Sequence, residues 1–407
     1  GNVQSDNADV AAHLCCAHQF PDSHRNAWLF RLRFSLQNGS RYQAFSEKLS
    51  WVVIIVAKIE NRAPNTGIFA PDMQTGKFTF NEVFTTETGQ EISGLELFYS
   101  TAGVFVPGKT KVAWVCHALT ASSDCVEWWP ELIGTGKAIN PEEYFIVCVN
   151  IPSSCYGSTG PLSFDPETGE KYYETFPFFT IADIVRTLIE VRKHLGIESI
   201  DLLIGGSMGG YQCLEWALVE PDVVKNLVLV ATSAKESAWG IAIHTAQRLA
   251  IEGDNSFGGP YDLAGARGLK AARAIGMLTY RNYGAFVQTQ SDSDDRLDNF
   301  KATSYIEYQG DKLVNRFNAY SYWLLTKTMD AHNVARGRGE VTEVLKRITA
   351  RALCIGISSD ILCPVQEQKF LVENIPGAEF VEIDSPFGHD GFLVEGKKIG
   401  GVIKSWL

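Results

Sequence analysis

The sequence predicts an α/β fold, in which a mostly parallel, doubly wound sheet carries an inserted helical lid. Apolar runs that read as buried strands alternate with helical segments, and this alternation is typical of a doubly wound sheet. A glycine-rich turn at 205–210 joins one such strand to a helix. Between 231 and 351 lie roughly 120 residues with helical periodicity and no strong strand, too many for a plain loop. The apolar runs are 111–116, 144–149, 200–204, 226–231, 351–357 and 379–383.

The remaining elements follow from periodicity. Residues 78–83 and 95–100 alternate between apolar and polar and predict an antiparallel pair. Helical patterns cover 181–195 and 211–219 in the first half of the chain. Within the long interval, three further segments predict lid helices: 240–251, 268–278 and 317–329. The expected organisation is a first core part at 73–235, a lid insertion at 236–348 and a second core part at 349–407.

Residues 1–72 do not follow this pattern. They lack a clear period, and Met73 is the first of only four methionines. Our hypothesis is that the functional protein starts at or near Met73, with residues 1–72 a misassigned or poorly ordered extension. The alternative is an organism-specific N-terminal extension.

Composition excludes several function classes. A net charge of −11 argues against nucleic acid or an anionic membrane as partner. Every apolar run is far shorter than the ~20 residues of a membrane helix, and no secretory signal is visible. Nine cysteines, an odd number, indicate reduced thiols and a cytoplasmic protein. The cluster at 13–18 (His-Leu-Cys-Cys-Ala-His) matches no zinc spacing, so no metal is expected.

The turn Gly-Gly-Ser-Met-Gly-Gly at 205–210 has the context of a nucleophile elbow, the strand–turn–helix signature of the α/β-hydrolase fold. The turn is so tight that glycines must flank the serine. Ser207 is therefore expected to expose its hydroxyl on a strained backbone, beside the Met208 amide. Taken alone, the pattern also fits a glycine-rich turn with an incidental serine, but the flanking strand and helix disfavour that interpretation.

A serine nucleophile needs a base and a carboxylate that orients the base. In this fold the three follow in the order serine, acid, histidine. His389 lies in a Pro/Gly loop after the last strand, and Asp360 follows the strand at 351–357. Asp384 and Asp390 compete for the acid role, but they lie too close to the histidine in sequence to turn back onto its ring. We expect Ser207, Asp360 and His389 to form the triad.

Several longer motifs resemble one family. From about residue 78 to the end, the chain is similar to homoserine O-acetyltransferases, the CoA-dependent acyltransferase branch of the α/β-hydrolase superfamily. The matching stretches are Cys-His-Ala-Leu-Thr at 116–120, Trp-Trp at 128–129, Cys-Tyr-Gly-Ser-Thr-Gly-Pro at 155–161, the elbow, Gln-Arg-Leu-Ala-Ile at 247–251, Tyr-Gln-Gly-Asp-Lys at 308–312 and Ser-Pro-Phe-Gly-His-Asp at 385–390.

The resemblance implies transfer of acetyl from acetyl-CoA to the side-chain hydroxyl of L-homoserine, a step of methionine biosynthesis. The implied mechanism is ping-pong through an acyl-serine, with Ser207 as nucleophile, His389 as base and acid, and Asp360 as orienter. It places an oxyanion hole at the backbone amides of Leu119 and Met208. Acetyl-CoA would be a co-substrate, and no permanently bound cofactor is expected.

The same resemblance suggests how the amino acid is recognised. Arg248 would hold the acceptor carboxylate and Asp390 its ammonium, in keeping with the planar cation and the anion that a free amino acid requires. It also implies a homodimer through the lid helices. The departures from the family are residues 1–72 and His244, which stands where an uncharged residue is expected.

Three alternatives stay open. The same scaffold could use a succinyl donor or accept serine, since a few pocket side chains decide both preferences. A serine esterase is a further alternative, distinguished by whether the lid excludes water. A non-catalytic binding protein is disfavoured by the complete set of triad residues.

Overall fold

The computed structural model describes residues 73–407. The hypotheses about residues 1–72 and the cluster at 13–18 fall outside these residues. In the described part of the chain, no helix is both long and apolar enough to cross a bilayer.

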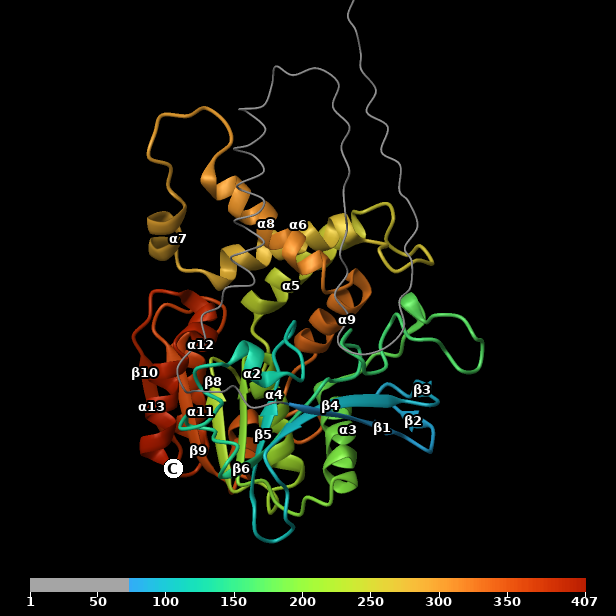
Figure 1. Ribbon diagram of the computed structural model, residues 1–407, viewed down its shortest axis with the longest axis vertical. Coiled ribbons are helices and arrows are strands. Elements are labelled where there is room, and N and C mark those ends of the chain that lie inside the picture. The colour runs from blue at the N-terminus through green and yellow to red at the C-terminus, as the bar shows by residue number, and fades with distance from the viewer. Residues whose placement is uncertain (1–72) are drawn as a thin grey trace, which may run out of the picture. The chain divides into compact units, whose positions relative to one another are not determined.

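An eight-stranded sheet forms the centre of the molecule, in the order β1-β4-β6-β5-β7-β8-β9-β10 (Figure 1). The strands from β6 to β10 pair in parallel, as the buried apolar runs predict. The predicted α/β fold is therefore confirmed. The strands are β1 (Gln74–Thr79), β4 (Glu96–Ala102), β5 (Lys111–Cys116), β6 (Tyr144–Val149), β7 (Leu202–Gly206), β8 (Asn226–Val230), β9 (Arg351–Ile357) and β10 (Glu379–Ile383).

One edge of the sheet is antiparallel. β1 pairs with β4, with Phe78 opposite Leu97, and β4 pairs antiparallel with β6. The predicted antiparallel pair is confirmed, although β1 begins four residues earlier than the alternation at 78–83 indicates. A small separate ribbon joins β2 (Phe84–Thr85) to β3 (Glu91–Ile92).

Side chains of the sheet alternate between two apolar cores. Along β5, Trp114 packs into the first core, whereas Ala113 and Val115 pack into the second. This two-residue period buries both faces of the strand and explains its unbroken apolar sequence.

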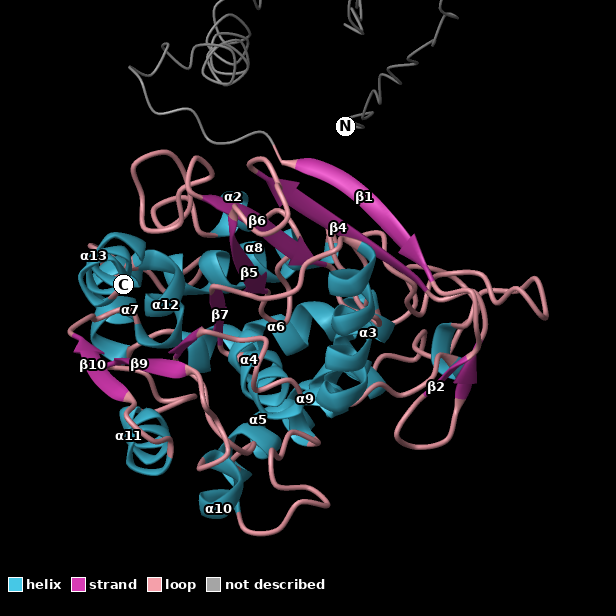
Figure 2. Ribbon diagram, turned by 90° about the horizontal axis from the view of Figure 1, so that it is seen from below, coloured by secondary structure: helices cyan, strands magenta, loops and turns pink. Residues whose placement is uncertain are grey.

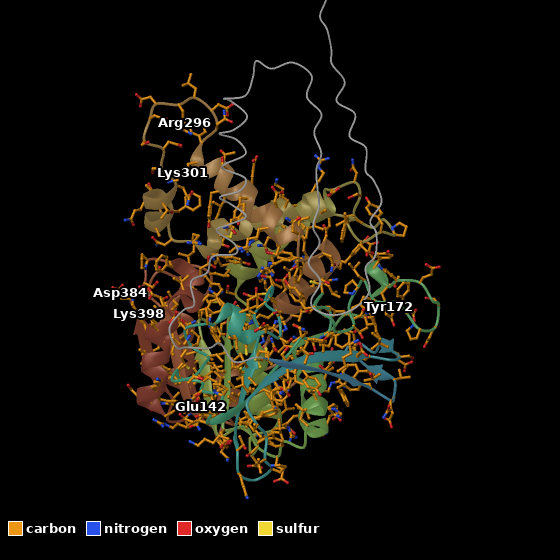
Figure 3. All side chains as sticks on the ribbon, viewed as in Figure 1. Glu142, Tyr172, Arg296, Lys301, Asp384 and Lys398 are labelled. Atoms are coloured by element: carbon orange, nitrogen blue, oxygen red, sulfur yellow. The ribbon has the colours of Figure 1, made fainter. Side chains whose placement is uncertain are left out.

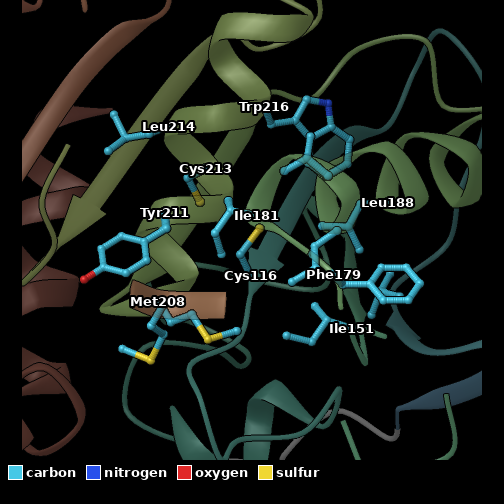
Figure 4. Packing of buried hydrophobic residues seen from close by; sticks show 14 of the residues in the cluster. Cys116, Ile151, Phe179, Ile181, Leu188, Met208, Tyr211, Cys213, Leu214 and Trp216 are labelled. Carbon is cyan, nitrogen blue, oxygen red and sulfur yellow. The ribbon is translucent and has the colours of Figure 1, made fainter. Parts of the chain in front are cut away.

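Helices cover both faces of the sheet. α3 (Ile181–His194), α4 (Met208–Val219) and α11 (Val365–Asn374) close the first core, where Tyr211, Leu214 and Trp216 of α4 are buried (Figure 4). α2 (Cys125–Trp128), α12 (Gly391–Val394) and α13 (Gly396–Trp406) close the second. Figure 2 shows α11 and α13 on opposite sides of β9 and β10. Two short 3₁₀ turns are η1 (Tyr173–Thr175) and η2 (Gly388–Asp390).

The chain between β8 and β9 is helical, and its helices are called the lid helices below. Figure 1 shows α5, α6 and α8 lying together beyond one end of the sheet. The patterns at 240–251, 268–278 and 317–329 predicted α5, α6 and α9 to within two residues at each end. The lid helices are α5 (Ala238–Glu252), α6 (Ala266–Tyr280), α7 (Tyr283–Gln290), α8 (Lys301–Val314), α9 (Ala319–Asp330) and α10 (Val341–Leu345).

Candidate active site

The topology brings distant segments to one edge of the sheet. Because β5, β7, β9 and β10 run in parallel, the segments that follow them emerge at the same end. These segments carry Leu119, Ser207, Asp360 and His389 respectively. The polar side chains among them are therefore assembled by strand direction, although up to 182 residues separate them in sequence.

Ser207, His389 and Asp360 form a continuous hydrogen-bonded chain. The Ser207 hydroxyl lies 2.9 Å from His389 Nε2, and His389 Nδ1 lies 2.6 Å from Asp360 Oδ2. The other Asp360 oxygen accepts the backbone N–H groups of Leu362 and Cys363, at 2.8 and 2.9 Å. Those two bonds fix the carboxylate, and the carboxylate in turn favours the imidazole tautomer protonated at Nδ1. Nε2 is then free to accept the serine proton.

Two opposing effects act on the catalytic histidine. Burial lowers the pKa of His389, but the negative charge of Asp360 and its hydrogen bond to the ring outweigh burial, so the pKa lies above the ordinary value. The imidazolium form is thus stabilised at the moment when the ring has taken a proton.

The serine is held on a strained backbone. Ser207 has φ 53° and ψ −127°, a conformation that non-glycine residues rarely adopt. The strand and helix on either side approach so closely that only glycines fit. A Cβ on Gly205 would lie 2.3 Å from the Gly209 carbonyl carbon, and one on Gly209 would lie 2.2 Å from the Cys116 carbonyl oxygen. α4 begins directly after the serine, at Met208, so its unpaired amides face the same region.

A buried histidine supports the loop that carries Leu119. The ring of His117 lies 2.9 Å from the Ala118 carbonyl through Nδ1 and accepts the Ile151 N–H through Nε2 at 3.1 Å. Burial lowers the pKa of His117 to about 4, which keeps the ring neutral and compatible with both contacts. Its role is therefore to position the loop after β5. Gln212 of α4 ties the same loop to the elbow by donating to the His117 carbonyl at 3.0 Å.

The triad opens into a cavity of about 490 Å³. Ser207 and His389 form part of its wall, beside lid residues Arg273 and Tyr280 of α6. Trp128 also lines it, whereas Cys125 is buried in the second core. Other lining residues include Leu119, Thr120, Ser122, Glu127, Tyr156, Lys312, Arg316, Met329, Leu362, Asp390 and Leu393.

Opposite charges meet beside the catalytic histidine. Asp390 lines the cavity and lies 3.0 Å from Arg281 Nε. Burial raises the pKa of Asp390, and the nearby charges of Arg281 and Arg273 oppose that rise. Arg273 stacks its guanidinium over the Tyr280 ring at 5.4 Å. Its Nε is buried and has no hydrogen-bond partner among residues 73–407, and the same holds for Nη1 of Arg248.

Arg248 lies elsewhere. Its guanidinium pairs with Asp330 at 2.6 Å, and the other oxygen of Asp330 lies 2.8 Å from His244 Nδ1. Arg248 is not among the described residues that line the cavity. No signal in the local sequence distinguishes Arg273 from Arg248, since both lie in lid helices.

Within residues 73–407, no group of three or more His, Cys, Asp or Glu side chains could hold a metal ion. The cavity instead combines a hydrogen-bonded serine with paired charges, which suits acyl transfer to or from a small zwitterion.

Comparison with solved structures places this geometry in a known fold. A homoserine O-acetyltransferase from Bacillus anthracis superposes with a TM-score of 0.77 at 24% identity, covering 82% of this chain and 97% of that one. The esterase E22 superposes with a TM-score of 0.75 at 22% identity, covering 82% of this chain and 100% of the other. At these identities, the likeness establishes the fold alone.

Sequence relatives are closer. The family model for the alpha/beta hydrolase fold matches residues 115–396. A homoserine O-acetyltransferase of Cyclobacterium marinum is 44% identical over 329 residues, covering 81% of this chain and 94% of the relative. One from Chlorobium chlorochromatii is 42% identical, covering 82% of this chain and 95% of the relative. The chain therefore belongs to the homoserine O-acetyltransferase family, on the α/β-hydrolase fold.

Proposed function

We propose that this protein transfers acetyl from acetyl-CoA to the side-chain hydroxyl of L-homoserine. The observation that carries the proposal is the hydrogen-bonded chain from Ser207 through His389 to Asp360, which opens into a cavity that also presents Arg273 and Asp390. The names of relatives 42–44% identical over four fifths of the chain supply the substrates. The product, O-acetyl-L-homoserine, serves methionine biosynthesis.

In the first half-reaction, Ser207 Oγ attacks the thioester carbonyl while His389 Nε2 takes the hydroxyl proton. The tetrahedral oxyanion is held by the backbone amides of Leu119 and Met208, and each such donor is worth about 10²–10³ in rate. When the C–S bond breaks, His389 returns its proton to the departing sulfur. Free CoA thiol and acetyl-Ser207 result.

In the second half-reaction, the homoserine hydroxyl takes the place of the thiol. His389 removes its proton, the oxygen attacks the acetyl carbonyl, and Ser207 Oγ leaves and is reprotonated by the same imidazole. Asp360 keeps the ring oriented in both directions and stabilises its protonated form.

The zwitterionic end of the acceptor is held by opposite charges. Asp390, beside the catalytic histidine, binds the ammonium, as the family resemblance implies. We assign the carboxylate to Arg273 rather than Arg248, because Arg273 lines the cavity, whereas Arg248 is not in that lining and pairs with Asp330. A guanidinium can bind a carboxylate with two parallel hydrogen bonds.

Lysine substitutions at Arg273 and Arg248 test which of the two arginines binds the homoserine carboxylate. Arg273→Lys should raise the homoserine KM by about 10-fold or more, because an ammonium cannot reproduce a two-pronged contact. Acetylation of Ser207 by acetyl-CoA should stay near normal. Arg248→Lys is the matched control and should leave the homoserine KM within about twofold, its partner being Asp330 rather than substrate. Steady-state kinetics with varied homoserine decide the matter, and the reverse pattern would restore Arg248 to the carboxylate role.

A two-step assay tests the function itself. Thiol release from acetyl-CoA is followed with and without homoserine, and O-acetylhomoserine is measured by mass spectrometry. A transferase gives one equivalent of thiol without acceptor and continuous release with it. Continuous thiol release without acceptor would instead identify a hydrolase. Succinyl-CoA and serine, offered as alternative substrates in the same assay, test the remaining alternatives.

The exposed apolar side chains of the lid helices bear on the oligomeric state. The protein is proposed to form a homodimer through the lid helices, which expose large apolar side chains: Trp239 is 54%, Leu249 62% and Leu278 61% exposed. Such side chains on neighbouring helices favour a protein interface.

A cytoplasmic location is proposed because the cysteines of the described residues are free thiols.

The dimer is testable by sedimentation. The wild type should sediment as a dimer at micromolar concentration, and the double variant Leu249→Glu/Leu278→Glu should sediment as a monomer, because charges at an apolar interface are costly to bury. Leu407→Glu, at the other end of the molecule, is the control. A dimer unaffected by the lid substitutions would place the interface elsewhere.

A further inference from the structure

Two cations line the cavity but have no place in the chemistry above. Lys312 lies in the last turn of α8, and Arg316 lies two residues beyond the end of that helix. Both side chains line the cavity that contains Ser207 and His389. Around them lie Thr120, Trp128 and Tyr156.

Among the described residues, no carboxylate forms an ion pair with Lys312 or Arg316. Within residues 73–407, Lys312 makes no ion pair, and Arg316 donates only to neutral oxygens. These are the Thr120 carbonyl at 2.6 Å, the Thr120 hydroxyl at 3.4 Å and the Tyr156 hydroxyl. The acidic side chain on this part of the lining is Glu127, so two cations face one anion. The protein as a whole has a net charge of −11, which makes a local excess of positive charge notable.

We propose that Lys312 and Arg316 bind the phosphate groups of the nucleotide part of the acyl donor. The proposal rests on the proposed function, since it assigns a subsite to the same cavity. An acyl-CoA joins a reactive thioester to phosphate groups through a long uncharged arm. If the thioester is at Ser207, the phosphates lie at the far end of that arm, and Lys312 and Arg316 line the same cavity as Ser207. Lysine and arginine are the side chains that hold phosphate oxygens by charge-assisted hydrogen bonds.

The two cations contribute differently. Arg316 also fixes Thr120, which follows Leu119 of the proposed oxyanion hole. Its loss would therefore slow the reaction with any acyl donor. Lys312 is exposed and, among the described residues, forms no hydrogen bond or ion pair with the triad or the loop after β5, so its substitution isolates the phosphate interaction. This difference decides which variant tests the proposal.

The test compares two donors that share the thioester and differ in the nucleotide: acetyl-CoA and acetyl-pantetheine. Lys312→Gln should raise the KM for acetyl-CoA about 5- to 10-fold, because a hydrogen bond to a charged group is lost. The KM for acetyl-pantetheine should not change. The wild-type KM for acetyl-CoA should also rise with salt, and less so in the variant, because screening weakens exposed charge pairs. Lys312→Arg should retain most of the affinity.

The matched control is Lys301→Gln. Lys301 begins the same helix and is exposed, but it lies at the far end of α8 and outside the cavity lining (Figure 3). It should leave both donors unaffected. If Lys301→Gln and Lys312→Gln raised the KM for acetyl-CoA equally, the effect would come from the overall charge of the protein and not from a phosphate subsite. Equal losses with both donors in Lys312→Gln would overturn it in favour of a structural role.

The outcome is separable from that of the proposed function. If the wild type acetylates homoserine from neither donor, yet is acetylated at Ser207 by p-nitrophenyl acetate, the proposed function fails. If it uses both donors with the same KM and Lys312→Gln has no effect, the transferase stands and the phosphate subsite is wrong.

Discussion

Ser207→Ala should abolish both the covalent intermediate and turnover. Acetyl-CoA without acceptor is expected to add one acetyl group to the wild-type peptide that contains Ser207 and none to the variant. The rate should fall on the order of 10⁴- to 10⁶-fold, since removal of a nucleophile leaves only the oxyanion donors and substrate binding. Intact-protein and peptide mass spectrometry measure the adduct, and thiol release measures turnover.

The substitution should not disturb folding, because it removes only the hydrogen bond between Ser207 and His389 and leaves the surrounding packing unchanged. Ser405→Ala, on the exposed side of α13, is the control and should behave as wild type. Turnover of Ser207→Ala at the wild-type rate, or an acetyl group on another residue, would remove the acyl-serine mechanism.

Asp360→Asn should lower kcat by on the order of 10⁴-fold while leaving the fold intact. The Asp360 carboxylate accepts from His389 at 2.6 Å and from two backbone amides. An asparagine can turn its NH₂ toward the ring and favour the tautomer whose Nε2 carries the proton. That nitrogen could then no longer accept a proton from Ser207.

The pH profile gives a second, independent readout. The imidazole must be neutral to act as base, so kcat/KM of the wild type should fall as pH drops through the pKa of His389. Asp360 holds that pKa above its ordinary value against the effect of burial. In Asp360→Asn only the smaller effects of Asp390 and Glu236 oppose burial, so the acid limb should move to lower pH. Asp384→Asn, a neighbouring exposed carboxylate, is the control. An unchanged limb in Asp360→Asn would show that another group titrates.

Much of the fold could be predicted because the signals are local. Buried parallel strands have unbroken apolar runs, and the runs at 111–116 and 351–357 match β5 and β9 without any shift. The run at 200–204 was placed two residues early, because the strand continues through the glycines of the elbow to Gly206. α8 was missed: it is amphipathic but largely exposed, so its apolar positions are few.

The triad residues were chosen from chain order and strand ends, and the structure brings these three together. The arginine that we assign to the acceptor carboxylate could not be chosen in that way. Arg248 and Arg273 both lie in lid helices, and nothing in either local pattern tells which helix face meets the cavity. Packing of α5 against α6 and α9 directs Arg248 to Asp330, while α6 directs Arg273 to the cavity.

The sequence by itself determined the order of the triad residues along the chain. A serine lies in a tight glycine turn, an acid follows a later strand, and a histidine follows the last strand. Backbone steric limits act over a few residues, and so do the two-residue period of a strand and the 3.6-residue period of a helix. A single segment of sequence is therefore enough to detect them. Tertiary structure alone decided which charges meet: Asp390 with Arg281, Arg248 with Asp330, and Lys312 with Arg316 in the lining of one cavity. The physical reason is that ion pairing and cavity lining depend on how helices rotate and pack against one another, and that is set by contacts between residues far apart in the chain.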